Sequence, residues 1–230
     1  MDEARARAGD GAPHLTTVWA ETQTAGRGRQ GRSWQSQAGY GLYFTAIVRI
    51  NLEPERYGLI PLLAGAILCS SVRDLTGVQA SLKWPNDLLA ADGRKLAGIL
   101  VEHDVKSSAF LIGIGLNVLP FAAADLNTGF ATLRELDPQA CAPTVLARVA
   151  LPLVQALKRF EREGFAAFAQ AFAARDLLYG REVRTTHTDV PQGVARGVSA
   201  QGALLVETKG RLVTVSSGEV SVRLDRPAAA

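Results

Sequence analysis

Residues 26–34 have the sequence GRGRQGRSW, which contains three glycines and three arginines and ends on a tryptophan. Apolar runs at residues 16–20 and 42–48 flank this stretch, and both have patterns typical of strands. Because so polar and glycine-rich a segment cannot be core, we expect a loop between two strands. Glycine lets the backbone approach a ligand closely, and arginine offers a planar, permanently charged group to phosphate or carboxylate.

Two interpretations of residues 26–34, called the Gly/Arg loop below, follow from this composition. In the first, a mobile loop closes on an anionic small molecule. In the second, a flexible basic hairpin is merely solvated or makes nonspecific contacts with nucleic acid. The loop by itself does not decide between them.

Three further stretches decide the question: KWPND at residues 83–87, KLAGILVE at 95–102 and IGIGLNV at 112–118. Together with Gln23 and the Gly/Arg loop, in this order and spacing, they resemble the biotin–protein ligases over about residues 4–223. The resemblance is to the monofunctional bacterial type without an N-terminal DNA-binding domain. It implies an α+β fold, in which a mixed β-sheet covered by helices, as in class II aminoacyl-tRNA synthetases, precedes a small SH3-like β-barrel.

The resemblance also implies a two-step reaction that consumes ATP. The carboxylate of biotin attacks the α-phosphate of ATP and gives biotinyl-5′-AMP and pyrophosphate. A lysine amine of a biotin carboxyl carrier protein or domain then displaces AMP. The first step brings two anions together, so positive charge must neutralise both, and the mixed anhydride must be kept from water. Mg²⁺ is expected with ATP, although the sequence shows no clear set of metal ligands.

Three catalytic residues are implied by the same correspondence. Lys95 is expected between the biotin carboxylate and the α-phosphate as a point charge, with Arg29 beside it. Asp87 is expected to orient and deprotonate the acceptor lysine, and a structural Lys83–Asp87 pair is the alternative. Gly98, three residues after Lys95, is expected on the opposite face of the strand, where it lets a bulky group approach the backbone.

Binding residues follow from the resemblance in two sets. The expected biotin-binding residues are Gln23, Gly26, Arg27, Gly28, Arg29, Lys95, Gly98, Gly113 and Gly115. The expected nucleotide-binding residues are Arg27, Arg29, Arg32, Trp34, Lys83, Asn86 and Asn117. Structural roles stay open for several of them: Gln23 as a polar residue at a strand end, Trp34 as an apolar lid, and the buried glycines as room for packing.

Two other functions stay open. A lipoate–protein ligase shares the fold and the carboxylate activation, although the Gly/Arg loop and KWPND favour biotin. A non-enzymatic biotin-sensing or nucleic-acid-binding module would use the basic loop and the small barrel. The net charge of +3 and pI of about 9.1 suit an anionic ligand or an acidic partner but are too small to argue for nucleic acid. We therefore expect no specific DNA binding, and a homodimer is compatible with the resemblance.

The composition, 47% hydrophobic and 20% charged, is that of a soluble globular protein rather than a disordered one. The two cysteines, Cys69 and Cys141, and three scattered histidines indicate neither a disulfide framework nor a zinc site. No signal core and no apolar run of membrane-spanning length is evident, so we expect a cytoplasmic protein with no membrane contact.

Apolar spacing and turn residues predict the remaining elements. Helices are expected at residues 2–8, 54–75, 143–162 and 165–177, and strands at 79–84, 96–102 and 109–118, with a loop at 125–141. Five short strands after Gly180 predict a small barrel. The expected domains are a catalytic domain at 1–179, an SH3-like domain at 180–226 and a disordered tail at 227–230.

The chain differs from the family at its beginning. Family members have a strand and a Ser-Thr pair just ahead of the helix expected at residues 2–8, and that pair helps to hold biotin. Here the sequence begins with Met1 and the helix itself. We expect this difference to bear on biotin affinity and on the completeness of the sheet, but not on the identity of the fold.

Overall fold

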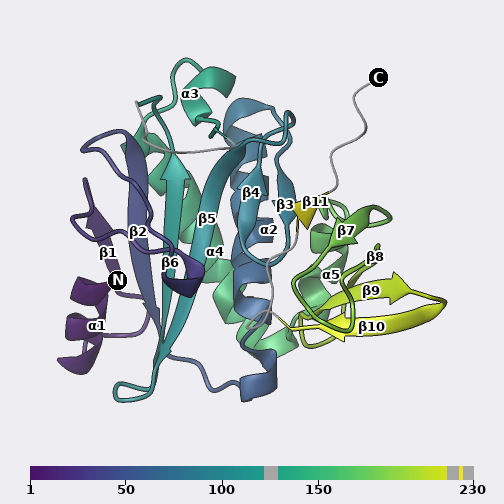
Figure 1. Cartoon of the computed structure of the whole chain (residues 1–230). Helices are drawn as coiled ribbons and strands as arrows, with labels where there is room; N and C mark the ends of the chain where they lie inside the picture. The colour runs from purple at the N-terminus through teal and green to yellow at the C-terminus, as the bar shows by residue number, and fades with distance from the viewer. Residues whose placement is uncertain (122–128, 217–222, 225–230) are drawn as a thin grey trace.

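A computed structural model describes residues 1–121, 129–216 and the backbone of 223–224, and its strands form two sheets (Figure 1). The larger sheet has six strands in the order β1-β2-β6-β5-β4-β3. Its strands are β1 (Thr17–Ala20), β2 (Gly41–Val48), β3 (Ser81–Lys83), β4 (Asp87–Leu89), β5 (Lys95–Asp104) and β6 (Ala109–Asn117). The predicted α+β class is confirmed, but the strand pairs of this sheet are antiparallel where we expected a mixed sheet. Parallel pairing involving these strands occurs in the described residues only at the isolated bridges Leu82–Asp176 and Lys95–Phe130.

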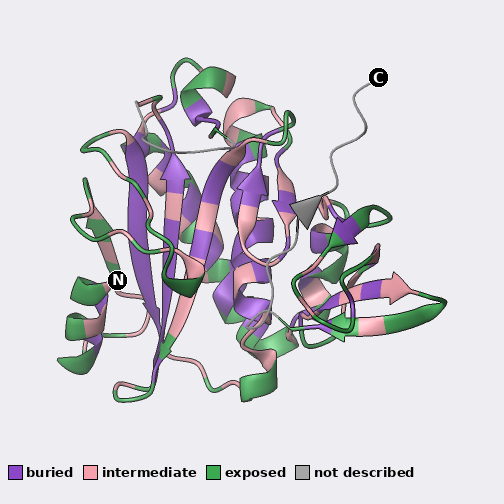
Figure 2. Cartoon of the chain, in the orientation of Figure 1, coloured by how far each residue is buried: buried purple, intermediate pink, exposed green. Residues whose placement is uncertain are grey.

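Helices cover one face of this sheet. The helices of the chain are α1 (Asp2–Gly9), α2 (Leu59–Thr76), α3 (Leu133–Leu136), α4 (Ala142–Glu163) and α5 (Ala166–Ala173), and all but α1 lie away from the opposite face. Helices α2 and α4 pack against the face that presents Leu42, Phe44, Ala46 and Val48 of β2. Figure 2 shows β2 buried along its whole length, as expected for a strand that lies between β1 and β6 in the sheet.

The opposite face is covered only at one end. Ala4 and Ala8 of α1 pack there against Ile47, Ala109 and Leu111. Beyond α1, most side chains that this face presents are small or polar: Tyr43 and Thr45 of β2, Lys95, Gly98 and Leu100 of β5, and Gly113 and Gly115 of β6. This part of the sheet is therefore free to form a binding site.

Most predicted elements are confirmed with shifts of a few residues. The helix expected at 54–75 is a short 3₁₀ turn, Pro54–Arg56, followed by α2, which ends at Gly77 with φ of 70°. The helix expected at 165–177 ends at Ala173, because residues 175–177 instead bond to β3. Within the loop expected at 125–141, the described residues contain α3, whose capping box of Thr132 and Glu135 was missed.

Helix α2 with its preceding turn, Pro54–Thr76, is long and apolar enough to cross a membrane by length and composition alone, although it is not an uninterrupted apolar run. In the structure 61% of its most apolar window is buried inside the protein. Because α2 packs on the sheet and beside α4, the apolar character is that of a core helix.

The second sheet has five strands in the order β10-β9-β8-β7-β11. They are β7 (Glu182–Arg184), β8 (Gln192–Val198), β9 (Leu204–Thr208), β10 (Arg211–Val215) and β11 (Arg223–Leu224). The strand expected at 220–223 lies mostly outside the described residues, as does the tail expected at 227–230. The division into domains at residue 180 stays a prediction.

The second sheet is joined to the first at β3 and the turn after it. Leu82 accepts a hydrogen bond from the backbone N–H of Leu177 and donates one to the carbonyl of Arg175, both at 2.8 Å. The indole of Trp84, which is 1% exposed, donates to the carbonyl oxygen of Gly202 at 3.0 Å. Gly202, with φ of 83°, packs so closely on Gly58 that an added Cβ would lie 3.0 Å from its backbone carbonyl.

We expect Gly202→Ala to destabilise the protein more than Gly210→Ala. Both positions have positive φ, so each change costs about 1–2 kcal/mol of backbone strain. Only Gly202 also meets backbone, because nothing lies within 4 Å of a Cβ at Gly210. The overpacking adds about 1–3 kcal/mol, measurable by urea unfolding. Equal losses for the two variants would show that the contact with Gly58 is not tightly packed.

Candidate functional site

The stretches singled out in the sequence meet in one pocket of about 360 Å³ on the open face of the larger sheet. Its walls come from the Gly/Arg loop, the turn before β4, β5, β6 and β2. Twelve of the predicted binding or catalytic residues line it: Gln23, Arg27, Gly28, Arg29, Arg32, Trp34, Asn86, Asp87, Lys95, Gly98, Gly113 and Gly115. Three predicted residues do not line this pocket: Gly26, Lys83 and Asn117.

The Gly/Arg loop forms a short hairpin over this pocket. Gly28 donates to the carbonyl of Arg32 at 2.7 Å, and Trp34 donates to the carbonyl of Gly26 at 2.9 Å. At Gly26 a Cβ would lie 2.2 Å from the carbonyl oxygen of Trp34, so no other residue fits without moving the hairpin. Gly26 therefore closes the hairpin, and it does so outside the pocket.

Two arginines of the loop have different surroundings. Arg27 forms an exposed ion pair with Asp2 of α1 at 2.5 Å. Arg29 is half-buried: burial lowers the pKa of its guanidinium, the nearby charge of Asp87 partly offsets this, and Arg32 lowers it further. Arginine nevertheless stays charged in proteins. A partly desolvated cation facing a pocket favours an anionic ligand there.

A β-bulge in β5 corrects the expected orientation of Lys95. Leu88 pairs with Ala97 and Leu89 with Lys95, so Leu96 is skipped in the pairing of β4 with β5. The extra residue reverses the alternation of side chains, and Lys95 lies on the same face as Gly98 rather than the opposite one. Indeed, a Cβ at Gly98 would lie 3.2 Å from Nζ of Lys95.

Lys95 and Asp87 form an ion pair inside the pocket. The distance from Nζ to Oδ1 is 2.7 Å, and the two side chains are 35% and 24% exposed. Nζ also lies 5.3 Å from the centre of the Trp34 ring, within the range of a cation–π interaction. Asp87 thus pairs with Lys95, and the backbones of Lys83 and Asp87 are register partners of β3 and β4, so the Lys83–Asp87 alternative stays open.

The glycines of β5 and β6 make room for other side chains. Gly98 and Gly115 are register partners, and Trp34 lies over both, at 3.0 Å and 2.8 Å from where their Cβ atoms would be. At Gly113 the occupant is Met1, whose sulfur would lie 2.9 Å from a Cβ. The structure thus supports the packing alternative for these glycines in the absence of ligand.

Among the pocket residues that the sequence did not indicate are Met1, Tyr43 and Thr45. Tyr43 and Thr45 alternate with apolar residues along β2, so the signal was a polar face on a strand that was interpreted only as core. Burial raises the pKa of the Tyr43 hydroxyl, which keeps it protonated at neutral pH. Nε1 of Trp34 is buried with no hydrogen-bond partner among the described residues, so this wall holds a donor that a ligand can use.

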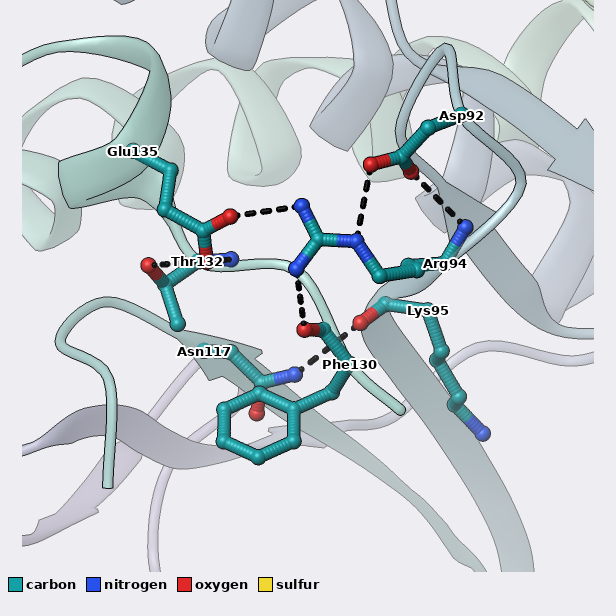
Figure 3. Close-up of polar contacts among 7 residues, drawn as sticks. All are labelled: Asp92, Arg94, Lys95, Asn117, Phe130, Thr132 and Glu135. Atoms are coloured by element: carbon teal, nitrogen blue, oxygen red, sulfur yellow. Dashed lines mark hydrogen bonds and ion pairs between the residues drawn. The ribbon is translucent and has the colours of Figure 1, made fainter. Parts of the chain in front are cut away.

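Asn86 and Asn117 hold backbone instead of pointing at open space. Asn86 exchanges two hydrogen bonds with Ile99: its Nδ2 donates to the carbonyl at 2.7 Å, and its own carbonyl accepts from the N–H at 2.9 Å. Asn117 is 6% exposed, and its Nδ2 donates to the carbonyl oxygen of Lys95 at 3.1 Å (Figure 3). Both side chains fix the strand that carries Lys95.

The two cysteines have different surroundings. Burial raises the pKa of the Cys69 thiol to about 12, which makes it an inert core residue. Cys141 is free and contacts the hydroxyl of Thr144. In the part of the chain that the structure describes, no three His, Cys, Asp or Glu side chains gather as a metal site.

Comparison with known proteins links the chain to one family. Residues 10–118 match the Biotin/lipoate A/B protein ligase family, and residues 179–223 match the biotin protein ligase C terminal domain. The biotin–[acetyl-CoA-carboxylase] ligase of Mycobacterium tuberculosis is 34% identical over 226 residues, which are 94% of this chain and 82% of that protein. The bifunctional ligase/repressor BirA of Escherichia coli is 36% identical over 210 residues, 89% of this chain. The match spans 65% of the length of BirA, slightly less than two thirds.

A solved structure is similar over nearly the whole chain. The biotin protein ligase from Aquifex aeolicus, in complex with biotin and ATP, superposes with a TM-score of 0.84 at 29% identity. The alignment covers 96% of this chain and 95% of the other. The fold of this chain and the arrangement of its elements therefore match those of the Aquifex aeolicus structure.

We expect Gly115→Ala to displace Trp34. The new methyl group would lie 2.8 Å from the indole ring, and overpacking of this kind lowers the free energy of unfolding by about 1–3 kcal/mol. The same change in a Trp34→Ala background should have much less effect, because its partner is gone. Urea unfolding of the four proteins of this cycle, with tryptophan fluorescence of the native states, measures the coupling. Losses that simply add would show that Trp34 does not lie on Gly115.

Proposed function

We propose that the chain, which belongs to the Biotin/lipoate A/B protein ligase family, is a biotin–[acetyl-CoA-carboxylase] ligase. It would activate biotin as biotinyl-5′-AMP and transfer it to a lysine of a biotin carboxyl carrier protein or domain. The observation that carries this proposal is the convergence of Lys95, Arg29 and Asp87 in one pocket with a glycine floor. Support also comes from the similar Aquifex aeolicus protein, whose structure contains biotin and ATP.

The first half-reaction needs the positive charges of this pocket. An oxygen of the biotin carboxylate forms a bond to the α-phosphorus of ATP while the bond from that phosphorus to the pyrophosphate oxygen breaks. Lys95 and Arg29 reduce the repulsion between carboxylate and phosphate and stabilise the charge that develops on the phosphoryl oxygens. Charge-assisted hydrogen bonds of this kind are worth about 1.5–3 kcal/mol each.

The Lys95–Asp87 ion pair has a consequence for this step. Asp87 holds Nζ of Lys95 within the pocket before any ligand binds, so Lys95 does not need to be ordered during the reaction. An arriving carboxylate and phosphate compete with Asp87 for the ammonium group. Once Lys95 turns to these anions, the Asp87 carboxylate is released to accept a proton from another amine.

The second half-reaction needs an uncharged amine. A free lysine has a pKa near 10.4, so the acceptor arrives mostly protonated at neutral pH. Asp87 would take this proton, the amine nitrogen would form a bond to the acyl carbon, and AMP would leave with the electron pair of the broken bond. Trp34, which covers the glycine floor, would exclude water from the mixed anhydride.

Mg²⁺ fits this site as a companion of the nucleotide. The carboxylates that line the pocket, Asp2, Glu3 and Asp87, are paired with Arg27, Arg7 and Lys95 respectively. Mg²⁺ in such enzymes is commonly held by substrate phosphates with few protein ligands. We therefore propose that ATP brings the ion and that the described residues contribute little to its coordination.

Further properties belong to the same proposal. The protein would act in the cytoplasm without specific DNA binding, and a homodimer is compatible with its fold. The mildly basic net charge of +3 suits anionic substrates better than it suits a DNA-binding role.

We expect Lys95→Ala to reduce biotin-dependent ATP–pyrophosphate exchange by roughly 10²–10³-fold, the usual loss for one charge-stabilising group. The fold should survive, because Lys95 is a partly exposed side chain on a strand of buried neighbours. Lys158→Ala, an exposed lysine of α4, is the control and should retain full exchange. Replacing biotin by lipoate in the wild-type assay separates the two substrate classes. Unchanged exchange in Lys95→Ala, or exchange with lipoate alone, would contradict the proposal.

We expect Asp87→Asn to separate the half-reactions. Biotinyl-5′-AMP should still form, while transfer to the acceptor lysine slows by roughly 10²–10⁴-fold, the range for loss of a general base. Single-turnover transfer from preformed adenylate measures the second step alone, and pyrophosphate exchange measures the first. If both steps decline equally, the role of Asp87 is to hold Lys95, and the acceptor amine loses its proton to another base.

A further inference from the structure

We infer that Arg94 positions Lys95 for the reaction. Arg94 does this by holding residues 130–135 against the beginning of β5. The inference rests on the proposed function, because it concerns the same reaction. Arg94 does not line the pocket, so any effect on the chemistry must pass through the backbone.

Lys95 lies outside the ladder between β5 and β6. The first register pair of that ladder is Ala97 with Leu116, two residues beyond Lys95. Beside Lys95, the place of β6 is taken by the segment that begins at Phe130. Ala131 donates its N–H to the carbonyl oxygen of Lys95 at 2.9 Å, and Phe130 and Lys95 form an isolated parallel bridge. The backbone of Lys95 is therefore held by Leu89 on the β4 side, and on the other side by Asn117 and residues 130–131.

The guanidinium of Arg94 holds this segment at two points. Its Nη1 donates to the carbonyl oxygen of Phe130 at 2.9 Å, and its Nη2 lies 2.6 Å from Oε2 of Glu135. Its Nε lies 2.7 Å from Oδ2 of Asp92 in the turn between β4 and β5. One planar group thus joins three acceptors from two separate parts of the chain, which the compact ammonium of a lysine cannot do.

Glu135 extends the network into the core. Its Oε1 accepts hydrogen bonds from both the backbone N–H and the hydroxyl of Thr132, each at 3.0 Å, and Thr132 is fully buried. Arg94 is the largest cause of the lowered pKa of the Glu135 carboxyl, and bonds to Arg94 lower the pKa of Asp92. Since both folded-state pKa values are below the ordinary ones, this network is present at neutral pH and is lost only as the pH falls through them.

Figure 3 shows that the neighbouring side chains of Arg94 and Lys95 point in different directions. The guanidinium of Arg94 points to Asp92 and Glu135, while the side chain of Lys95 extends away from them, and the carbonyl of Lys95 faces Asn117. Each ion pair of Arg94 is partly exposed, with side chains 36–50% accessible, so the network contributes little to overall stability. Its effect should therefore appear in the position of Lys95 rather than in the stability of the fold.

The test compares Arg94→Gln, Arg94→Lys and Glu135→Gln with the control Arg159→Gln. Arg159 forms an equally short and similarly exposed pair with Glu163 at 2.7 Å on α4, away from Lys95. The measured quantities are the single-turnover rate of biotinyl-5′-AMP formation, the Kd for biotin and the thermal midpoint, all in the full chain.

We expect Arg94→Gln to slow adenylate formation by roughly 10–100-fold, the scale of a misplacement of about 1 Å. The Kd for biotin and the thermal midpoint should change little. Arg94→Lys should recover only part of the rate, Glu135→Gln should lose less than Arg94→Gln, and Arg159→Gln should match the wild type.

Two results would overturn the inference while leaving the proposed function intact. One is wild-type adenylation in Arg94→Gln. The other is a loss of rate that accompanies equal losses of biotin affinity and thermal stability, which would indicate a merely structural role. A wild-type protein that forms no adenylate would instead remove the proposed function, and this inference with it.

Discussion

The pocket depends on one irregularity in the pairing of β4 with β5. Because β5 contains one residue more than β4 opposite Leu88 and Leu89, Leu96 and Ala97 both point into the core and Lys95 turns to the open face. A regular strand would have placed the ammonium group against α2, where burial without a partner is costly. The ladder with β6 begins only at Ala97, so the carbonyl of Lys95 has Asn117 and Ala131 as its partners.

Once Lys95 faces the pocket, its charge determines the arrangement around it. Asp87 pairs with it, and Trp34 lies over it with the negative face of an indole ring. Arg29 remains nearby as a second, partly desolvated cation. The pocket therefore holds more positive than negative charge at its centre, which is the condition for bringing a carboxylate and a phosphate together.

The absence of side chains on the floor is the second constraint. Gly98 and Gly115 are paired across β5 and β6, and only hydrogen atoms there leave space for an indole ring. The ring packs on backbone, and its buried N–H has no partner among the described residues. A ligand that enters must either share this space with Trp34 or move it, so loop and floor act as one unit. The second sheet contacts this unit indirectly. Gly202, between β8 and β9 of the second sheet, accepts a hydrogen bond from the indole of Trp84, and Trp84 lies in the turn that leads to Asn86 and Asp87.

The sequence by itself determined the class of fold, most element positions and many of the residues that line the pocket, since periodicity and motif order depend on local chemistry. Twelve of the predicted site residues indeed line one cavity. The sequence could not determine which face Lys95 occupies, because the bulge arises from pairing with β4 and leaves no mark in KLAGILVE. The sequence also missed Tyr43 and Thr45, because their place in the pocket depends on how far α1 covers that face of β2. Nor did it indicate the hydrogen bond from Asn117 to the carbonyl of Lys95. Composition fixes which residues can bind an anion, but only long-range packing fixes which of them meet, because contacts between distant segments depend on the register of the whole sheet.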